Sequence, residues 1–266
     1  MLEYEKVLEN VMGYILEVGE MQTRRLGEKG LKVHSKTNRD DLVTEVDELS
    51  EKMLLRAIGS AYPEHGFLSE ECGSKNSQAE YLWVIDPLDG TTNYTQGIPI
   101  FAISVALQYQ GETVLGVVYQ PPLGEVFTAI KGKGAYLNGQ EIKVSTKTDL
   151  ANCVLGTGFP YDKAKHRHNN SNYFSYFVPR VRGLRRLGAA AYDLANVAAG
   201  RLDGFWELNL SPWDVAAGIL LVEEAGGRVS FLEKRGVSLV AGNDDICITL
   251  RNSIEEVDRE TGDIVG

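Results

Sequence analysis

The segment from Tyr81 to Asn93, which reads Y-L-W-V-I-D-P-L-D-G-T-T-N, constrains the fold more than any other part of the chain. Its first half is aromatic, aliphatic and β-branched, and it predicts a buried strand that ends at Asp86 and Pro87. Asp86 and Asp89 are three positions apart on this proline-bent turn, with the Leu88 carbonyl between them. Because their oxygens can point at one spot, the turn suits a hard cation such as Mg²⁺.

The same segment predicts an anion site directly beside the cation site. Gly90 allows close approach of the backbone, and Thr91, Thr92 and Asn93 bring hydroxyls and amides to a helix start, where donors and dipole favour an anion. Adjacent cation and anion sites are typical of metal-assisted chemistry on a phosphate. The alternative is a purely structural turn, since Asp-Pro and Asp-Gly are ordinary turn formers.

Composition and charge limit the class of protein. The chain has 266 residues, of which 43% are hydrophobic and 24% charged, which is enough for a sizeable folded core. The net charge of −10 argues against a non-specific nucleic-acid surface or an anionic-membrane surface. No stretch approaches about 20 uninterrupted apolar residues, so no membrane span is expected.

The N-terminus and the cysteines indicate a cytoplasmic protein. The first 20 residues carry five glutamates, where a secretory signal would need a basic start and an apolar block. The cysteines are odd in number and lack CxxC spacing, which fits a reducing compartment and argues against a thiolate zinc site. We expect each to be a small buried residue: Cys72, Cys153 and Cys247.

Residues 1–150 are predicted to form an N-terminal α+β lobe that holds the metal and phosphate site. Apolar spacing predicts helices over residues 5–27 and from about 41 to 58. Strand-like runs follow at residues 66–71, 98–107, 114–119 and 126–130. Asn138-Gly139 between two β-prone runs is the strongest short hairpin signal, so this part predicts an antiparallel sheet.

Several polar residues of this half have two interpretations. Thr44 and Asp47 have the spacing of a capping box, which is a purely structural explanation, and a functional role for the pair is the alternative. Glu70 and Glu71 end a short strand and could complete the cation site. Lys36 lies in a basic loop, residues 31–39, and could reach a phosphate, although a solvated lysine is the commoner case.

Residues 151–266 are predicted to form a C-terminal α/β lobe that completes the substrate pocket. Strands are expected at residues 153–158, 205–208, 228–231 and 237–241, and a small-residue helix at 187–200. A helix from Ser211 to about Ala225, opened by a Ser-Pro-Trp-Asp cap, is expected to be the last well-defined one, with a frayed tail after Glu255. His166 and His168 are interpreted as residues of a solvated loop rather than metal ligands.

With these elements in order, the chain resembles the inositol monophosphatase family from about the first helix to Ala241. W-V-I-D-P-L-D-G-T-T-N is similar to the first family signature, and P-W-D-V-A-A-G-I-L-L-V-E-E-A-G-G is similar to the second. The resemblance implies an α+β fold, a layered α-β-α-β-α sandwich shared with fructose-1,6-bisphosphatases. It also implies a Mg²⁺ cofactor, lithium sensitivity and a homodimer.

The resemblance assigns roles to individual residues. The side-chain and carbonyl ligands of Mg²⁺ would be Glu70, Asp86, Leu88, Asp89 and Asp214. Residues that polarise the attacking water or support it would be Asp47, Thr91 and Glu71. The phosphate would lie on Gly90, Thr91 and Thr92, and the alcohol part of the ester on Gly188, Ala189, Ala190 and Glu207. A structural alternative for Glu207 is an ion pair with Arg185 or Arg186.

The implied function is Mg²⁺-dependent hydrolysis of myo-inositol monophosphate, a small phosphorylated polyol, by direct attack of metal-activated water. The sequence offers no Cys or His nucleophile in a motif, which fits hydrolysis without a covalent phosphoenzyme. Alternatives within the superfamily are fructose-1,6-bisphosphatase, histidinol-phosphatase and 3′-phosphoadenosine phosphatase. An alternative of another class is a transcription-associated binding protein with residual phosphatase activity.

Overall fold

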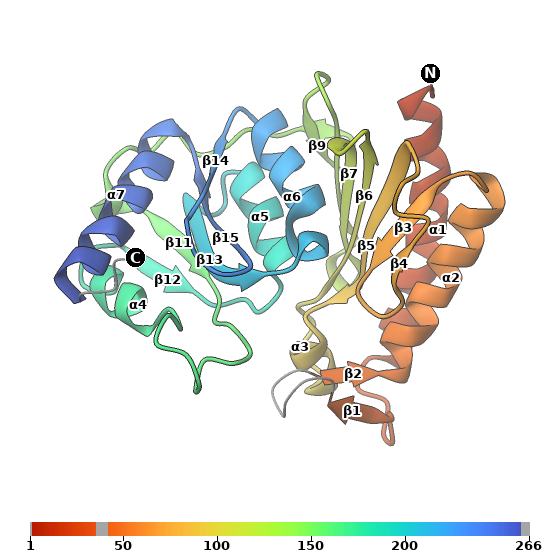
Figure 1. Cartoon of the computed structure of the whole chain (residues 1–266), viewed down its shortest axis with the longest axis horizontal. Helices are drawn as coiled ribbons and strands as arrows, with labels where there is room; N and C mark the ends of the chain where they lie inside the picture. Colours follow the sequence, from red (N-terminus) through yellow and green to blue (C-terminus); the bar gives the residue numbers. More distant parts are fainter. Residues whose placement is uncertain (1, 36–41, 262–266) are drawn as a thin grey trace.

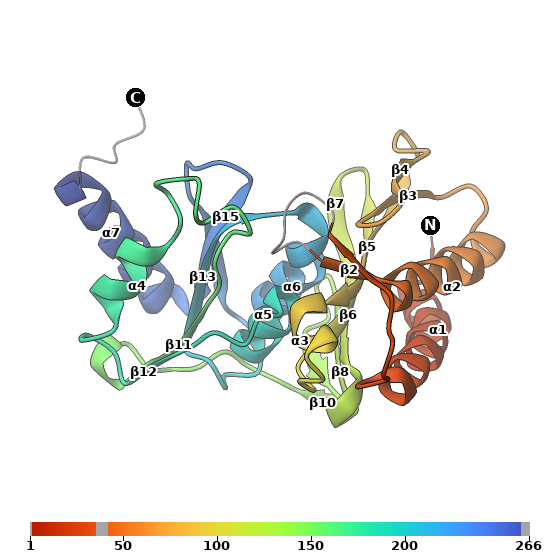
Figure 2. The same cartoon turned by 90° about the horizontal axis from the view of Figure 1, so that it is seen from below.

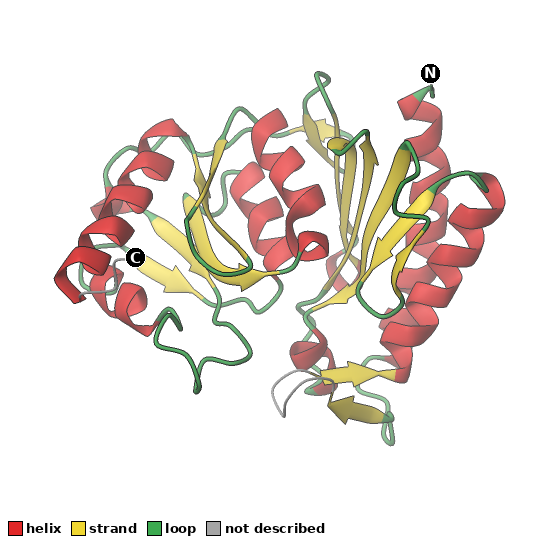
Figure 3. Ribbon diagram, viewed as in Figure 1, coloured by secondary structure: helices red, strands yellow, loops and turns green. Residues whose placement is uncertain are grey.

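Two β-sheets alternate with three layers of helices, so that the chain has the predicted α-β-α-β-α order (Figures 1 and 3). The computed structural model describes residues 2–35 and 42–261. The outer helices α1 (Tyr4–Arg25) and α2 (Glu45–Ala61) cover one end of the stack. Helices α4 (Ser171–Phe177) and α7 (Asp244–Thr261) cover the other end (Figure 2). The two helices in the middle are α5 (Ala190–Ala198) and α6 (Pro212–Glu224).

The first sheet has eight strands and is antiparallel except where β3 pairs with β5. Its strands, in spatial order, are β10 (Gln140–Glu141), β9 (Ala135–Leu137), β8 (Glu125–Ile130), β7 (Glu112–Gln120), β6 (Ala102–Tyr109), β5 (Tyr81–Asp89), β3 (Gly66–Ser69) and β4 (Gly73–Lys75). The predicted Asn-Gly hairpin is the turn between β9 and β10. The antiparallel arrangement predicted for residues 98–144 is confirmed.

Helices cover both faces of the first sheet, and side chains alternate between two cores. On β5, Trp83 and Ile85 pack with Ile15 and Leu54 of the outer helices. Val84 packs with the central helices on the opposite face. Both faces are therefore buried, which explains why the central strands read as continuous apolar runs.

Glycines allow the central helix α6 to approach both the first sheet and α5 closely. A Cβ at Gly116 on β7 would lie 3.0 Å from the carbonyl oxygen of Ala217 on α6. A Cβ at Gly218 on α6 would lie 2.6 Å from the Cβ of Leu194 on α5. These contacts hold α6 against β7 on one side and against α5 on the other.

The second sheet has five strands, in the order β12 (Gly183–Arg185), β11 (Val154–Thr157), β13 (Gly204–Leu210), β15 (Val237–Gly242) and β14 (Arg228–Phe231). Strand β11 is parallel to both β12 and β13, whereas β15 is antiparallel to its neighbours. Smaller elements are the hairpin β1 (Val33–Ser35) with β2 (Leu42–Thr44), the short helix α3 (Thr91–Thr95), and two 3₁₀ turns, η1 (Pro121–Leu123) and η2 (Leu150–Asn152).

Two predictions from the sequence are wrong, one on where strand β5 ends and one on which helix is the last. Strand β5 continues past Pro87 to Asp89, because a bulge between Asp86 and Asp89 restores pairing with Ala102 of β6. The last well-defined helix is α7, and it runs through Glu255 to Thr261. Its apolar residues recur at helical spacing and are buried against the second sheet: Ile246, Leu250, Ile254 and Val257.

Other differences are smaller. Strand β6 begins at Ala102 rather than at residue 98, and α5 begins at Ala190 rather than at residue 187. Cys153 and Cys247 are buried as expected, but Cys72 is exposed because it lies in the turn after β3. Lys36 lies outside the described residues. Among the described helices, none is long and apolar enough to cross a membrane.

Candidate active site

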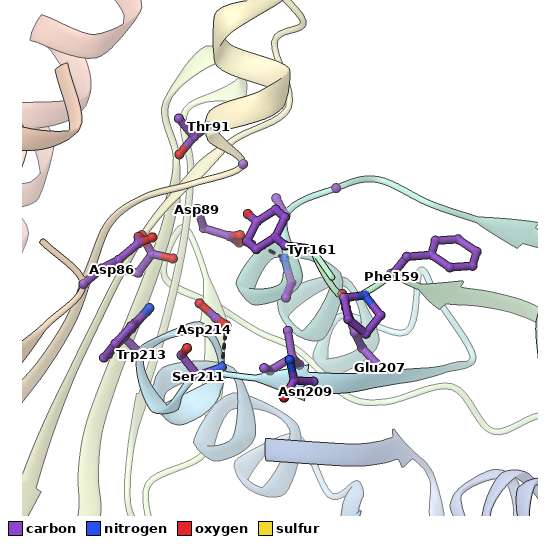
Figure 4. Close-up of a pocket in the computed structure, with 18 of the residues that line it drawn as sticks. Asp86, Asp89, Thr91, Phe159, Tyr161, Glu207, Asn209, Ser211, Trp213 and Asp214 are labelled. Atoms are coloured by element: carbon purple, nitrogen blue, oxygen red, sulfur yellow. Dashed lines mark hydrogen bonds between the residues drawn. The ribbon is translucent and has the colours of Figure 1, made fainter. Parts of the chain in front are cut away.

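A pocket of about 350 Å³ lies between the two sheets, where the carboxyl ends of strands from both sheets meet (Figure 4). Most of the residues predicted from the sequence line it: Glu70, Asp86, Leu88, Asp89, Gly90, Thr91, Gly188, Ala189, Ala190, Glu207 and Asp214. Three predicted residues are outside the lining. Asp47 lies behind Thr91, Glu71 follows Glu70 in a turn, and the residue Thr92 is exposed.

Strand direction explains why distant segments meet at this pocket. Strands β11, β12 and β13 are mutually parallel across the second sheet, so the segments that follow them emerge at one edge. Strands β3 and β5 are likewise parallel, which brings Glu70 beside the end of β5. Ligands commonly bind outside the carboxyl ends of parallel strands.

The turn after Asp86 is held by hydrogen bonds from both sides. The Leu88 amide donates to Asp86 Oδ1 at 3.0 Å, and Gln22 Nε2 of α1 donates to the Pro87 carbonyl at 2.8 Å. Gly90 then adopts φ 102°, a left-handed conformation that favours glycine. A Cβ there would also lie 3.2 Å from the carbonyl oxygen of Gly188, so glycine is required for the close approach of the two segments.

Asp47 has a structural role and a role toward the pocket at the same time. Its Oδ2 accepts hydrogen bonds from the amide and the hydroxyl of Thr44, which completes the predicted capping box of α2. Its Oδ1 accepts the hydroxyl hydrogen of Thr91 at 2.8 Å. Burial raises the pKa of Asp47 to about 6, against the lowering effect of these hydrogen bonds.

Asp89 connects the first sheet to α5. Ala189 at the N-cap of α5 supplies no side-chain bond, and Asp89 takes that role from a distant part of the chain. Its two oxygens accept the amides of Ala190 at 3.0 Å and Ala191 at 2.8 Å. The carboxylate therefore satisfies the first turn of α5 while it faces the pocket. Burial nevertheless raises its pKa to about 7.

Asp214 occupies the same kind of position at the start of α6. Its Oδ2 accepts the Ser211 amide at 2.7 Å in a capping box, as the Ser-Pro-Trp-Asp sequence predicted (dashed in Figure 4). Burial, followed by the charges of Asp89 and Glu70, raises its pKa well above the usual value, although the Ser211 amide acts in the opposite direction.

The pocket concentrates negative charge. Burial raises the pKa of Asp86 well above its usual value, and the charges of Glu70, Asp89 and Asp214 and a hydrogen bond with Glu70 add to the effect. Among the described residues, no three Asp, Glu, His or Cys side chains form a ready-made metal site. The donors that face the pocket are carboxylates and the Leu88 carbonyl, which are the hard oxygen ligands that Mg²⁺ or Ca²⁺ prefers.

Glu207 lies on the opposite side of the pocket, in the middle of β13. It is 9% exposed, and a Cβ at Gly158 would lie 2.0 Å from its Oε1, so only glycine fits there. Burial raises the pKa of Glu207 to about 8, and the charge of Arg186 acts in the opposite direction. Within residues 42–261, no hydrogen bond or ion pair joins Glu207 to Arg185 or Arg186, which argues against the ion-pair alternative.

Several residues that line the pocket were not predicted from the sequence, among them Phe159, Tyr161, Arg186 and Asn209. Each follows a parallel strand of the second sheet or ends one. In Figure 4 the Tyr161 ring lies beside Asp89. Although the residue as a whole is 49% exposed, desolvation of its phenol group and then the charges of the nearby carboxylates raise the pKa of Tyr161 well above its usual value. The signal that could have found these residues is their position directly after predicted strands, provided that the strands had been known to be parallel.

A layered fold of this order, with buried carboxylates that meet at the ends of its strands, defines a phosphatase. The chain belongs to the inositol monophosphatase family, whose model matches residues 3–256. This family is generally metal-dependent, in agreement with the oxygen donors of the pocket.

Individual relatives resemble the chain over most of its length. A protein of Pseudomonas aeruginosa named Nus factor SuhB is 47% identical over 227 residues, 81% of this chain and 83% of the relative. An inositol-1-monophosphatase of Mesorhizobium japonicum is 40% identical over 246 residues, 90% of either chain. The solved structure of an inositol monophosphatase from Anabaena has a TM-score of 0.86 at 37% identity, and the match covers 96% of this chain and 97% of that one.

Proposed function

We propose that this protein hydrolyses inositol monophosphate to inositol and phosphate with Mg²⁺ as cofactor. The observation that carries the proposal is the pocket itself, in which carboxylates and the Asp47–Thr91 pair lie on one side and a buried glutamate on the other. A relative that is 40% identical is an inositol-1-monophosphatase, which supports this choice of substrate.

The residues that would hold Mg²⁺ are Glu70, Asp86, Leu88 through its carbonyl, Asp89 and Asp214. Negative charge on carboxylates that are buried or half-buried so close together is costly without a cation, which supports the assignment. When bound, Mg²⁺ neutralises the phosphate, lowers the pKa of water and stabilises the departing alkoxide. Asp89 and Asp214 can serve this role and still cap their helices, because each carboxylate oxygen has two lone pairs.

The Asp47–Thr91 pair would orient the attacking water. Because Asp47 accepts the hydroxyl hydrogen of Thr91, the Thr91 oxygen keeps its lone pairs for a water in the pocket that it lines. That water would then attack phosphorus directly, with Glu71 supporting it from the adjacent turn. No side-chain nucleophile is required.

The substrate would lie across the gap between the two sheets. Its phosphate would contact the backbone of Gly90, Thr91 and Thr92. Of these, Thr92 is exposed. The ring of the substrate would contact Gly188, Ala189 and Ala190, where a Cβ at Gly188 would clash with Arg186. The two oxygens of Glu207 would accept hydrogen bonds from neighbouring ring hydroxyls.

The direct test is phosphate release from a panel of inositol, sugar, histidinol and nucleotide phosphates, with metal-stripped and Mg²⁺-loaded protein. We expect the highest kcat/KM for inositol monophosphate, no turnover in chelator, and inhibition by Li⁺, which can occupy a Mg²⁺ position without supplying its charge. Full turnover of the metal-stripped protein would exclude the metal assignment, and a preference for fructose 1,6-bisphosphate would exclude the substrate.

A second candidate role is binding to the transcription machinery, which rests on the 47% identity to a protein named Nus factor SuhB. Co-purification with RNA polymerase of both the unaltered protein and an Asp86→Asn variant tests this role, because binding independent of catalysis should survive the substitution. Absence of co-purification in both samples would remove this candidate.

We also propose that the protein is a cytoplasmic homodimer. Three free cysteines are compatible with a reducing compartment, and the homodimer follows from the family resemblance. Light scattering coupled to size exclusion tests the assembly, since a mass near 29.3 kDa would indicate a monomer.

A further inference from the structure

The turn that presents Glu70 to the pocket, and that carries Glu71 next to it, is fastened to α2 by a buried carboxylate. Glu51 is 2% exposed and lies four positions after Asp47, so both acids are on the same face of α2. Its Oε1 accepts the Glu71 amide at 3.0 Å, the Cys72 amide at 3.1 Å and the hydroxyl of Ser69. The side chain thus holds the first residues after β3.

The opposite side of the same turn is fixed by the sheet. The Glu70 amide donates to the Ile85 carbonyl at 3.3 Å, which continues the pairing of β3 with β5. Glu70 therefore lies between a backbone bond to β5 and the Glu51 bonds to its neighbours. A glutamate has three rotatable side-chain bonds, so the backbone must be fixed before its carboxylate can be placed reproducibly.

We propose that Glu51 is a positioning residue that sets the affinity of the pocket for its divalent cation. It touches no reacting group and acts through Glu70 and Glu71. One oxygen of this carboxylate is the acceptor for two amides and a hydroxyl, which accounts for a buried glutamate at this position. The inference rests on the proposed function only in its choice of Mg²⁺ as the cation.

The test compares Glu51→Ala and Glu51→Gln with the control Glu48→Gln, which removes one negative charge from an exposed position of the same helix. Calorimetric titration with Mg²⁺ should show about 10- to 100-fold weaker binding for Glu51→Ala, the usual range for residues that orient metal ligands. Glu51→Gln should lie between Glu51→Ala and the unaltered protein, and Glu48→Gln should match the unaltered protein. Saturating Mg²⁺ should restore most of the kcat.

Hydrogen exchange in the metal-free protein tests the positioning separately from the chemistry. The amides of Glu71 and Cys72 should exchange faster in both Glu51 variants, while the amides of β5 keep their protection. If Glu51→Ala does not fold, Glu51→Gln carries the test, because it has the same size. Unchanged exchange at these amides, or unchanged Mg²⁺ affinity in a folded variant, would overturn the inference. If the unaltered protein released no phosphate from any substrate, the proposed function would fail, and the exchange result would still decide the role of Glu51.

Discussion

The two sheets contribute to the pocket in different ways. The first sheet supplies a short continuous segment, residues 86–91, whose polar groups are buried and hydrogen-bonded. The second sheet supplies single residues on or after three strands, and they differ in exposure, since Glu207 is 9% exposed and Tyr161 is 49% exposed. Buried groups that are held by hydrogen bonds suit chemistry that needs fixed geometry. Groups that come one at a time from separate strands and loops can change with little effect on one another, and they suit substrate selection.

The largest expected effect concerns the carboxylates of the pocket. It tests whether Asp214, which follows the second sheet, binds the same cation as the carboxylates of the first sheet. Asp86→Asn and Asp214→Asn should each lose nearly all turnover, because each removes charge from the proposed cation ligands. Phosphate release and Mg²⁺ titration measure the loss, with the exposed Glu112→Gln as control. Retained activity in Asp214→Asn alone would show that the second half of the chain contributes no ligand.

Asp47→Asn should lower kcat by about 10²- to 10⁴-fold with little change in KM, since Asp47 acts on water rather than on substrate. The variant can still accept from Thr44, so the cap of α2 is largely kept. Steady-state kinetics on inositol monophosphate measure the two constants. A rise in KM alone would contradict the role assigned to the Asp47–Thr91 pair.

Carboxyl groups on both sides of the pocket, Asp47 and Glu207, should make the metal-free protein less stable as pH rises. Burial raises the pKa of Asp47 to about 6 and that of Glu207 to about 8, so the folded state binds these protons more tightly than the unfolded chain does. Stability from these groups is full below their unfolded pKa values of about 4 and is lost as pH rises to about 6 and 8, respectively. For Asp47 the loss is about 3 kcal/mol.

Calorimetry of the metal-free protein between pH 4.5 and 8.5 measures this loss as a fall in Tm of roughly 2–4 °C per kcal/mol. Asp47→Asn should remove the lower part of the pH dependence, and Glu207→Gln the upper part. A Tm that rises over this range would contradict the direction of both shifts.

Glu207→Gln should raise KM for inositol monophosphate by about tenfold, the size of one charge-assisted hydrogen bond, and scarcely alter hydrolysis of an aryl phosphate. Comparing the two substrates separates recognition of the inositol ring by Glu207 from the chemistry at the phosphate. Equal losses on both substrates would mean that Glu207 stabilises the pocket structure and does not bind the hydroxyls of the ring.

The smallest expected effect is that of Tyr161→Phe, at most about fivefold in kcat/KM. The substitution removes one hydroxyl from a half-exposed residue of the second sheet's side of the pocket. Tyr14→Phe on α1, outside the pocket, is the matched control. A loss as large as that of Asp47→Asn would place Tyr161 in the chemistry and break the distinction between the two sides.

Local features of this fold were predictable from the sequence. The caps at Thr44 and Ser211 and the hairpin at Asn138 were identified correctly because each depends on residues within a few positions. Strand termination at Pro87 was predicted wrongly because the bulge depends on pairing with β6. Helix α7 was missed although its apolar residues repeat at helical spacing.

The sequence by itself determined which polar groups the segment from Asp86 to Thr91 would carry, and it placed a glycine where the chain needs a left-handed conformation, at Gly90. Only the tertiary structure decided what surrounds them. Asp89 caps a helix 101 residues away, and Tyr161 reaches the pocket because β11 runs parallel to β13. Such contacts depend on how sheets and helices pack through many weak apolar interactions distributed over the chain, and no short segment contains that information.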